Sequence, residues 1–178
     1  MSFKPTKSVA HTTQKGKEMI TIHGKPDVED VKLSEHFSLF EFCKTSHKEY
    51  QTKNLHYGKS IQSRLEPLAD FLEEVRKLCG CPIIITSAVR CPELNKAIGG
   101  VPTSQHQSGH AADICPTGKG TIQDHFCKIF KSNLIYDQLI LEESKGKIWI
   151  HISYVGMKGR RQALYYKGKK YVPYTGDK

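Results

Sequence analysis

The sequence lacks the features that would place the protein in a membrane. No uninterrupted apolar run approaches the roughly 18 residues that a membrane-spanning helix needs. The first 17 residues, MSFKPTKSVAHTTQKGK, are basic but have no apolar middle of the kind found in a secretory signal. We therefore expect a protein without a membrane span that is synthesised in the cytoplasm.

Cysteine is present but not in metal-binding or redox patterns. None of the six cysteines forms a CxxC pair, and the single intervening residue between Cys79 and Cys81 is the wrong spacing for a zinc knuckle. Internal repeats and low-complexity blocks are also missing. The cysteines are expected to be small buried residues with free thiols, which fit a reducing compartment.

Acidic residues are scarce relative to basic ones. The chain has 27 Lys and Arg against 18 Asp and Glu, a formal charge of +9, which predicts attraction to an anionic partner. The basic residues are spread over both ends of the chain rather than clustered with aromatics, and no recognised DNA- or RNA-binding motif is present. Nucleic acid, a membrane surface and an acidic cell wall all fit this charge, which alone does not choose among them, although no specific nucleic acid is expected.

Length and composition favour one globular domain with extensions. The 178 residues are 38% hydrophobic and 25% charged, which is typical of a soluble folded chain. Residues 1–30 are expected to form a basic, flexible arm, with a short strand at residues 19–23. Residues 31–165 form the predicted domain, and residues 166–178 a C-terminal hairpin or tail.

Hydrophobic periodicity predicts several helices. In residues 60–78, apolar side chains recur at steps of three and four, which makes one helical stripe. Pro67 is expected to kink or interrupt the first part of this helix, and Gly80 to end it. A short helix is predicted to begin after Ser38, which forms a capping box with Glu41. Two more are expected, at residues 93–98 and from residue 121 onward.

Short β-branched or alternating runs predict the strands. Residues 82–86 fit a buried strand, and residues 137–142 and 148–154 fit two strands joined by a hairpin turn at 143–147. Residues 165–172 fit either a final hairpin or a basic tail. The expected fold class is α+β, an antiparallel sheet with helices packed to one side.

The stretch Ser104–Asp113 (SQHQSGHAAD) gathers potential metal ligands. Imidazole and carboxylate are the groups that a catalytic zinc takes, usually three from the protein with one position left for water. His106, His110 and Asp113 would share one face of a helix, whereas a turn at Gly109 would bring His106 and Asp113 together without His110. Spacing alone leaves both arrangements open.

A third ligand and a general base are expected from distant elements. His151 is the best candidate ligand, because it interrupts an apolar strand at a position that usually holds an apolar residue. Glu142 and Glu143, at the end of the preceding predicted strand, could take a proton from water. Arg90, after a strand and before a turn, could grip a carboxylate or stabilise charge on an attacked carbonyl.

These residues resemble the zinc D-Ala-D-Ala carboxypeptidase family of peptidoglycan peptidases, whose fold is shared with the hedgehog signalling domain and the vancomycin-resistance dipeptidases. The resemblance extends from about residue 33 to residue 164 and is strongest to the small phage- and bacterial-type members. It rests on separated motifs in matching order: Leu33–Phe42, Ser87-x-x-Arg90, Arg90–Asn95, Gly99–His106, Ser104-x-His106-x-x-Gly109-x-Ala111-x-Asp113, Asp137–Glu142 and Trp149-x-His151.

The resemblance implies a role for each candidate residue. The zinc ligands would be His106, Asp113 and His151, with Arg90 orienting the substrate and Ser104 beside the site. Some relatives carry a proton acceptor two or three positions before the last ligand, where this chain has Trp149 and Ile148. The hedgehog-type arrangement places the base on the preceding strand, which implies Glu142 here, with Glu143 as second choice.

The function implied is zinc-dependent hydrolysis of peptidoglycan stem peptides or cross-links, as D,D-carboxypeptidase or endopeptidase. The protein would act as a monomeric, lysin-like enzyme that reaches the wall after release or cell lysis. The alternative is a non-catalytic, zinc-containing cell-wall or protein-binding module of the same fold.

Overall fold

The computed structural model describes residues 28–167 and 170–176. Most of the predicted N-terminal arm, including its expected strand at residues 19–23, lies outside this part of the chain. No helix within the described part is long and apolar enough to cross a membrane.

The helices begin and end largely where local sequence signals predict them. Ser38 caps the first helix by accepting a hydrogen bond from the Glu41 backbone N–H, and the rings of Phe37 and Phe42 pack edge to face across this turn. Gly80 ends the longest helix in a left-handed conformation, with φ of 70°. The bounds are α1 Leu39–Cys43, a 3-10 turn Lys48–Tyr50, α2 Gln51–Ser60, α3 Gln62–Cys79, α4 Pro92–Ala97 and α5 Ile122–Phe130.

Helix α3 differs from the prediction at its start. It continues through Pro67 without interruption. A separate helix, α2, precedes it in a segment where the sequence shows no stripe of apolar residues. Pro67 and Ser63, whose carbonyl loses its usual partner four residues on, are both exposed, so water can satisfy that carbonyl. The predicted interruption is therefore wrong, because the proline lies on the solvent side of the helix.

Six strands form one sheet in the order β1-β2-β4-β3-β5-β6. All neighbours are antiparallel except β3 and β5, which are parallel, so the α+β class is confirmed and the expected antiparallel sheet is in fact mixed. The chain leaves β4, reverses direction and returns along the free edge of β3, where it must run parallel to that strand. The bounds are β1 Ile83–Ser87, β2 Ala111–Pro116, β3 Gln138–Ser144, β4 Lys147–Ser153, β5 Gln162–Lys167 and β6 Lys170–Pro173.

Two hairpins shape the sheet. β3 and β4 join through Lys145 and Gly146, both with positive φ (51° and 73°), as a tight two-residue turn requires. The turn is thus shorter than the predicted 143–147, and β3 extends past Glu142. β5 and β6 form the C-terminal hairpin, the first of the two alternatives for that segment.

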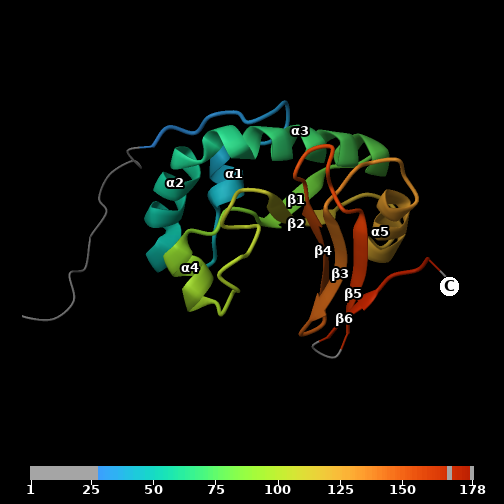
Figure 1. The fold of residues 1–178 in the computed structure, drawn as a ribbon. Helices are drawn as coiled ribbons and strands as arrows, with labels where there is room; N and C mark the ends of the chain where they lie inside the picture. Colours follow the sequence, from blue (N-terminus) through green and yellow to red (C-terminus); the bar gives the residue numbers. More distant parts are fainter. Residues whose placement is uncertain (1–27, 168–169, 177–178) are drawn as a thin grey trace, which may run out of the picture.

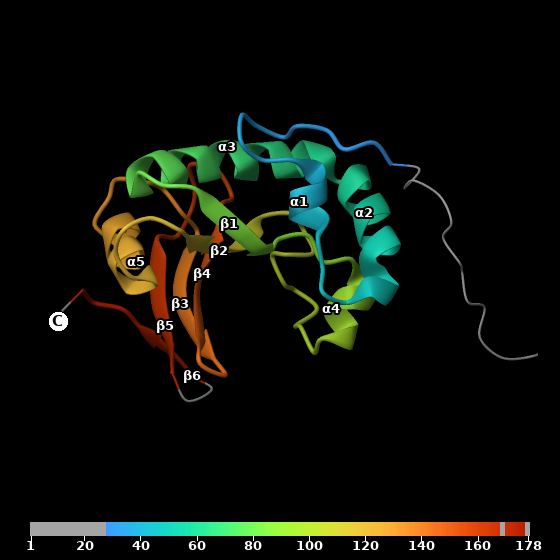
Figure 2. The same cartoon turned by 180° about the vertical axis from the view of Figure 1, so that it is seen from behind.

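The sheet has one core face and one open face. Ile150 and Ile152 of β4 are fully buried with the apolar stripe of α3 and with Phe126 and Ile129 of α5. Side chains alternate along a strand, so Trp149 and His151 point to the opposite face. Figures 1 and 2 show α3 and α5 against one side of the sheet, while α1, α2 and α4 gather at the end away from β5 and β6.

Strand β1 is less buried than predicted. Ile83 and Ile85 belong to the core, but Ile84 is 54% exposed. β1 lies at the edge of the sheet, so only one of its faces is covered.

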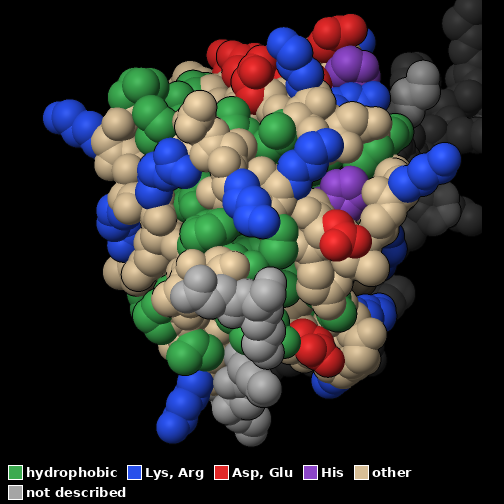
Figure 3. Space-filling view, turned by 90° about the vertical axis from the view of Figure 1, so that its right-hand side faces the viewer, with side chains coloured by type: hydrophobic (Ala, Val, Ile, Leu, Met, Phe, Trp, Pro, Cys, Tyr) green, Lys and Arg blue, Asp and Glu red, His purple; other side chains and the backbone are tan. Residues whose placement is uncertain are grey.

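At the other end of the molecule, Figure 3 shows Lys and Arg side chains spread over the surface among hydrophobic ones rather than gathered in one stripe.

Candidate metal centre

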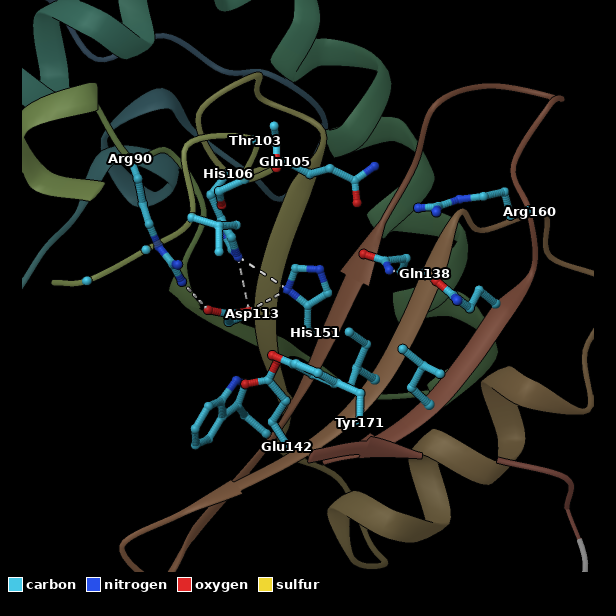
Figure 4. A pocket seen from close by; sticks show the side chains of 18 residues that line it. Arg90, Thr103, Gln105, His106, Asp113, Gln138, Glu142, His151, Arg160 and Tyr171 are labelled. Atoms are coloured by element: carbon cyan, nitrogen blue, oxygen red, sulfur yellow. Dashed lines mark hydrogen bonds and ion pairs between the residues drawn. The ribbon is translucent and has the colours of Figure 1, made fainter. Parts of the chain in front are cut away.

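The open face of the sheet brings the two predicted strand ligands together. Asp113 of β2 and His151 of β4 are direct cross-strand partners, so their side chains emerge side by side on the same face. His106 reaches the same point from the turn that precedes β2 (Figure 4). All three residues are buried.

Three potential ligand atoms converge tightly. His151 Nδ1 lies 3.0 Å from Asp113 Oδ1, and His106 Nε2 lies 3.3 Å from that oxygen and 3.2 Å from His151 Nδ1. A tetrahedral zinc with bonds of 2.0–2.1 Å separates its ligands by about 3.3 Å. The spacing and the His/Asp/His chemistry therefore fit a zinc ion with little rearrangement.

The protonation of His106 is set by the backbone. Its Nδ1 lies 2.7 Å from the carbonyl oxygen of Ala88, which can only accept a hydrogen bond, so Nδ1 carries the proton. Burial lowers the pKa of His106, partly opposed by the charge of Asp113, and this favours the neutral ring. Nε2 is then left with a free lone pair directed at Asp113 and His151, as a metal ligand requires.

Asp113 is held ionised. Burial alone would raise its pKa, but interactions with His106 and His151 bring the pKa well below its usual range. Arg90 adds a charged hydrogen bond of 2.6 Å from Nη2 to the second carboxylate oxygen, Oδ2. One oxygen of Asp113 thus faces the histidines while the other is anchored by Arg90.

The arrangement of residues 104–110 is the turn, not the helix. Gly109 has φ of 76°, and a Cβ there would lie 2.9 Å from Leu65 Cδ2, so both conformation and packing call for glycine. His110 is turned away from the cluster, and its Nδ1 lies 3.0 Å from Ser108 Oγ. His106 and Asp113 therefore meet while His110 does not, as the turn arrangement predicts.

Arg90 and Ser104 are both beside the cluster. Arg90 Nε donates to Ser87 Oγ at 3.0 Å, so Ser87 and Asp113 together fix the guanidinium plane. Arg90 therefore faces the cavity and also orients Asp113. The spacing of the sequence does not predict this contact with Asp113. Ser104 is half-buried and lines the same cavity.

The cluster opens into a cavity of about 820 Å³, and the two candidate bases differ in their access to it. Glu142 lines the cavity and is the cross-strand partner of Trp149 on the open face. Glu143, one residue on, points to the other side of the sheet and is exposed. Burial, then the charge of Asp113, raises the pKa of Glu142, as is typical of groups that exchange protons.

Sequence reasoning missed several residues around this cavity. The sequence marks Trp149 only as a position that cannot take a proton, and it assigns no role to Gln105, Gln138, Arg160 or Tyr171. All of them line the cavity. Alternation could have found two of them: Trp149 lies two positions from His151 and Gln138 four positions from Glu142, so each shares a face of the sheet with that residue.

Asp137, directly before β3, connects two residues that line the cavity, Gln105 and Arg160. This buried carboxylate accepts hydrogen bonds from Arg160 Nε and Nη2 at 2.8 and 2.6 Å, and from Gln105 Nε2 at 2.9 Å. Gln105 immediately precedes His106, so Asp137 ties the turn carrying that histidine to the start of β3. These bonds, chiefly those of Arg160, lower the pKa of Asp137 to about 2.

We expect Asp137→Asn to reduce the free energy of unfolding by about 2 kcal/mol at pH 7, through loss of charged hydrogen bonds. A carboxylate with a lowered folded pKa stabilises the fold above its unfolded pKa of about 3.9 and loses this effect as the pH falls toward about 2. Urea unfolding of both proteins at pH 7 and pH 2.5 should show the difference shrinking. An equal difference at both pH values would contradict the prediction.

The α+β fold and a buried His/Asp/His cluster beside a cavity glutamate define a metallohydrolase-type centre. A family model for Peptidase M15 matches residues 35–153, from just before α1 through β4. The chain belongs to this family, the zinc D-Ala-D-Ala carboxypeptidase family, and membership implies metallopeptidase activity. No curated protein matches the chain.

Proposed function

We propose that this protein is a zinc peptidase that hydrolyses stem peptides or cross-links of peptidoglycan. The observation that carries the proposal is the convergence of His106, Asp113 and His151 within one cavity that also holds Glu142. The family supplies the class of reaction. Peptidoglycan as the substrate rests on the resemblance of the motifs to wall peptidases.

His106 Nε2, Asp113 Oδ1 and His151 Nδ1 would hold the zinc. When bound, zinc supplies Lewis-acid chemistry, polarising a peptide carbonyl and making a neighbouring water acidic enough to ionise at a pH of about 7. The Ala88 carbonyl keeps the proton of His106 on Nδ1, and Arg90 keeps Asp113 oriented. The protein therefore pre-arranges all three groups before any ligand arrives.

Glu142 is the proposed general base. As a carboxylate in the cavity it accepts a proton from the attacking water, and as a carboxylic acid it returns that proton to the nitrogen of the leaving amine. Its partly buried position favours this exchange, because the neutral form is not strongly disfavoured there. Arg90 retains N–H donors beyond those given to Ser87 and Asp113, and these are proposed to bind a substrate carboxylate.

The proposal predicts that the purified, zinc-loaded protein releases new peptide ends from peptidoglycan. Muropeptides should be analysed by mass spectrometry after digestion with and without a chelator, and the mass changes will identify the bond that is cut. Cleavage is expected only without chelator. If zinc-loaded protein binds cell walls but releases no fragment, a non-catalytic wall-binding module replaces the peptidase.

The setting of this activity is also proposed. The charge of +9 and the Lys and Arg side chains spread over the surface (Figure 3) support adsorption to anionic wall polymers. We infer a monomeric, endolysin-like enzyme of phage type that meets the wall after release by lysis. Adsorption of this kind should weaken as salt screens the charges.

A further inference from the structure

The C-terminal hairpin supplies a cavity wall from outside the part of the chain that matches the family model. That match ends at Ser153, whereas β5 and β6 follow it. Gln162 and Leu164 of β5 line the cavity, so alternation places Tyr166 on the same face. Tyr171 of β6 is the cross-strand partner of Tyr166 and shares that face.

The hairpin holds the Tyr171 ring in a defined place. Its centroid lies 4.8 Å from that of Tyr166, with the planes tilted by 47°, a separation typical of packed aromatic pairs. Figure 4 shows the ring below His151 in that view, with its hydroxyl end toward Glu142. A side chain braced in this way can present its hydroxyl with little loss of conformational entropy.

The Tyr171 hydroxyl is available for a ligand. Tyr171 is 56% exposed, and its hydroxyl makes no hydrogen bond within the described residues. Burial raises its pKa, and so do the negative charges of Glu142 and Asp113. The phenol therefore keeps its proton at neutral pH and remains a donor.

Peptide hydrolysis needs such a donor. Negative charge develops on the oxygen of the attacked carbonyl, and fixed hydrogen-bond donors aimed at that oxygen are among the largest contributions to catalysis. Arg90 directs Nε to Ser87 and Nη2 to Asp113, so part of its donor capacity is already engaged. Tyr171 approaches the cluster from the opposite wall of the cavity, with its hydroxyl uncommitted.

We infer that Tyr171 is a further catalytic residue, whose hydroxyl donates a hydrogen bond to the carbonyl oxygen of the scissile peptide as that oxygen becomes negative. The proton stays on the phenol throughout, so the residue stabilises charge and transfers nothing. This inference rests on the proposed peptidase function.

The test is Tyr171→Phe, which removes one hydroxyl and keeps the ring packed on Tyr166. With the zinc-loaded protein and a muropeptide that it cleaves, kcat should fall by about a hundredfold while KM changes by less than about twofold. Affinity for a phosphinate analogue of the tetrahedral intermediate should fall by a similar factor, and zinc affinity should not change. Tyr166→Phe, the matched control on the same hairpin, should behave like the wild type.

The outcomes separate this inference from the function on which it rests. A wild-type protein that cleaves no peptide overturns both. An active wild type with an equally active Tyr171→Phe variant overturns the role of Tyr171 alone. Equal losses in Tyr171→Phe and Tyr166→Phe would also overturn it, because they would show that the hairpin packing, not the hydroxyl, is what matters.

Discussion

Replacing His151 with alanine is expected to abolish peptide hydrolysis and to weaken zinc binding by roughly a hundredfold to a thousandfold. A structural zinc site with four ligands is worth roughly 10–16 kcal/mol, so one ligand accounts for about 2.5–4 kcal/mol. His151 also contacts both other members of the cluster, with its Nδ1 3.0 Å from Asp113 Oδ1 and 3.2 Å from His106 Nε2. Its loss leaves two ligands, too few to keep zinc against dilution.

Zinc content after dialysis, competition with a chromogenic chelator and muropeptide cleavage would measure this effect. His110→Ala is the matched control, because His110 lies in the same stretch as His106 but outside the cluster. It should retain zinc and activity. A His151→Ala protein that holds zinc as tightly as the wild type would rule out His151 as a ligand.

Glu142→Gln is expected to lower kcat by about a thousandfold, the usual contribution of a general base, while zinc binding and KM change little. Glutamine is nearly isosteric and still lines the cavity, but it cannot accept a proton from water. Protonation of Glu142 should also produce the acid limb of the kcat/KM profile: activity falls as the pH falls and the base becomes neutral. That limb should be missing from the residual activity of the variant.

Glu143→Gln provides the control for this substitution. The two glutamates are adjacent in sequence but face opposite sides of the sheet, and only Glu142 lines the cavity. Kinetics of both variants on one muropeptide substrate, with zinc content measured in parallel, will separate loss of the base from loss of the metal. If Glu142→Gln keeps full activity, another group takes the proton and the assignment fails.

Much of the fold follows from local patterns in the sequence. The stripe from Ile61 to Val75 and the isoleucines of β4 mark core-facing positions directly, and the exception within β4, His151, stands out against them. The residues that cap helices, such as Ser38 and Gly80, are also recognised from their immediate neighbours in the sequence. These features depend only on neighbours along the chain, so the sequence is sufficient to predict them.

The remaining features depend on pairings between distant segments. The spacing of His106, His110 and Asp113 fits a helix as well as a turn, and the packing of Gly109 against Leu65 is what the structure adds. Likewise, β5 lies parallel to β3 because of where the chain returns after β4, which no local pattern records. The cavity roles of Asp137 and Tyr171 arise from the same long-range arrangement.

The register of the β3–β4 hairpin has a consequence for how such a site can vary. Because Glu142 and Trp149 are directly opposed, their side chains start from neighbouring points on the same face of the sheet. Position 149 is one of the two at which the resemblance implies that some relatives carry a proton acceptor. A proton acceptor at either position would therefore reach the same region of the cavity. Positions 142 and 149 of the hairpin are thus two places in the sequence from which a side chain reaches the same region of the cavity.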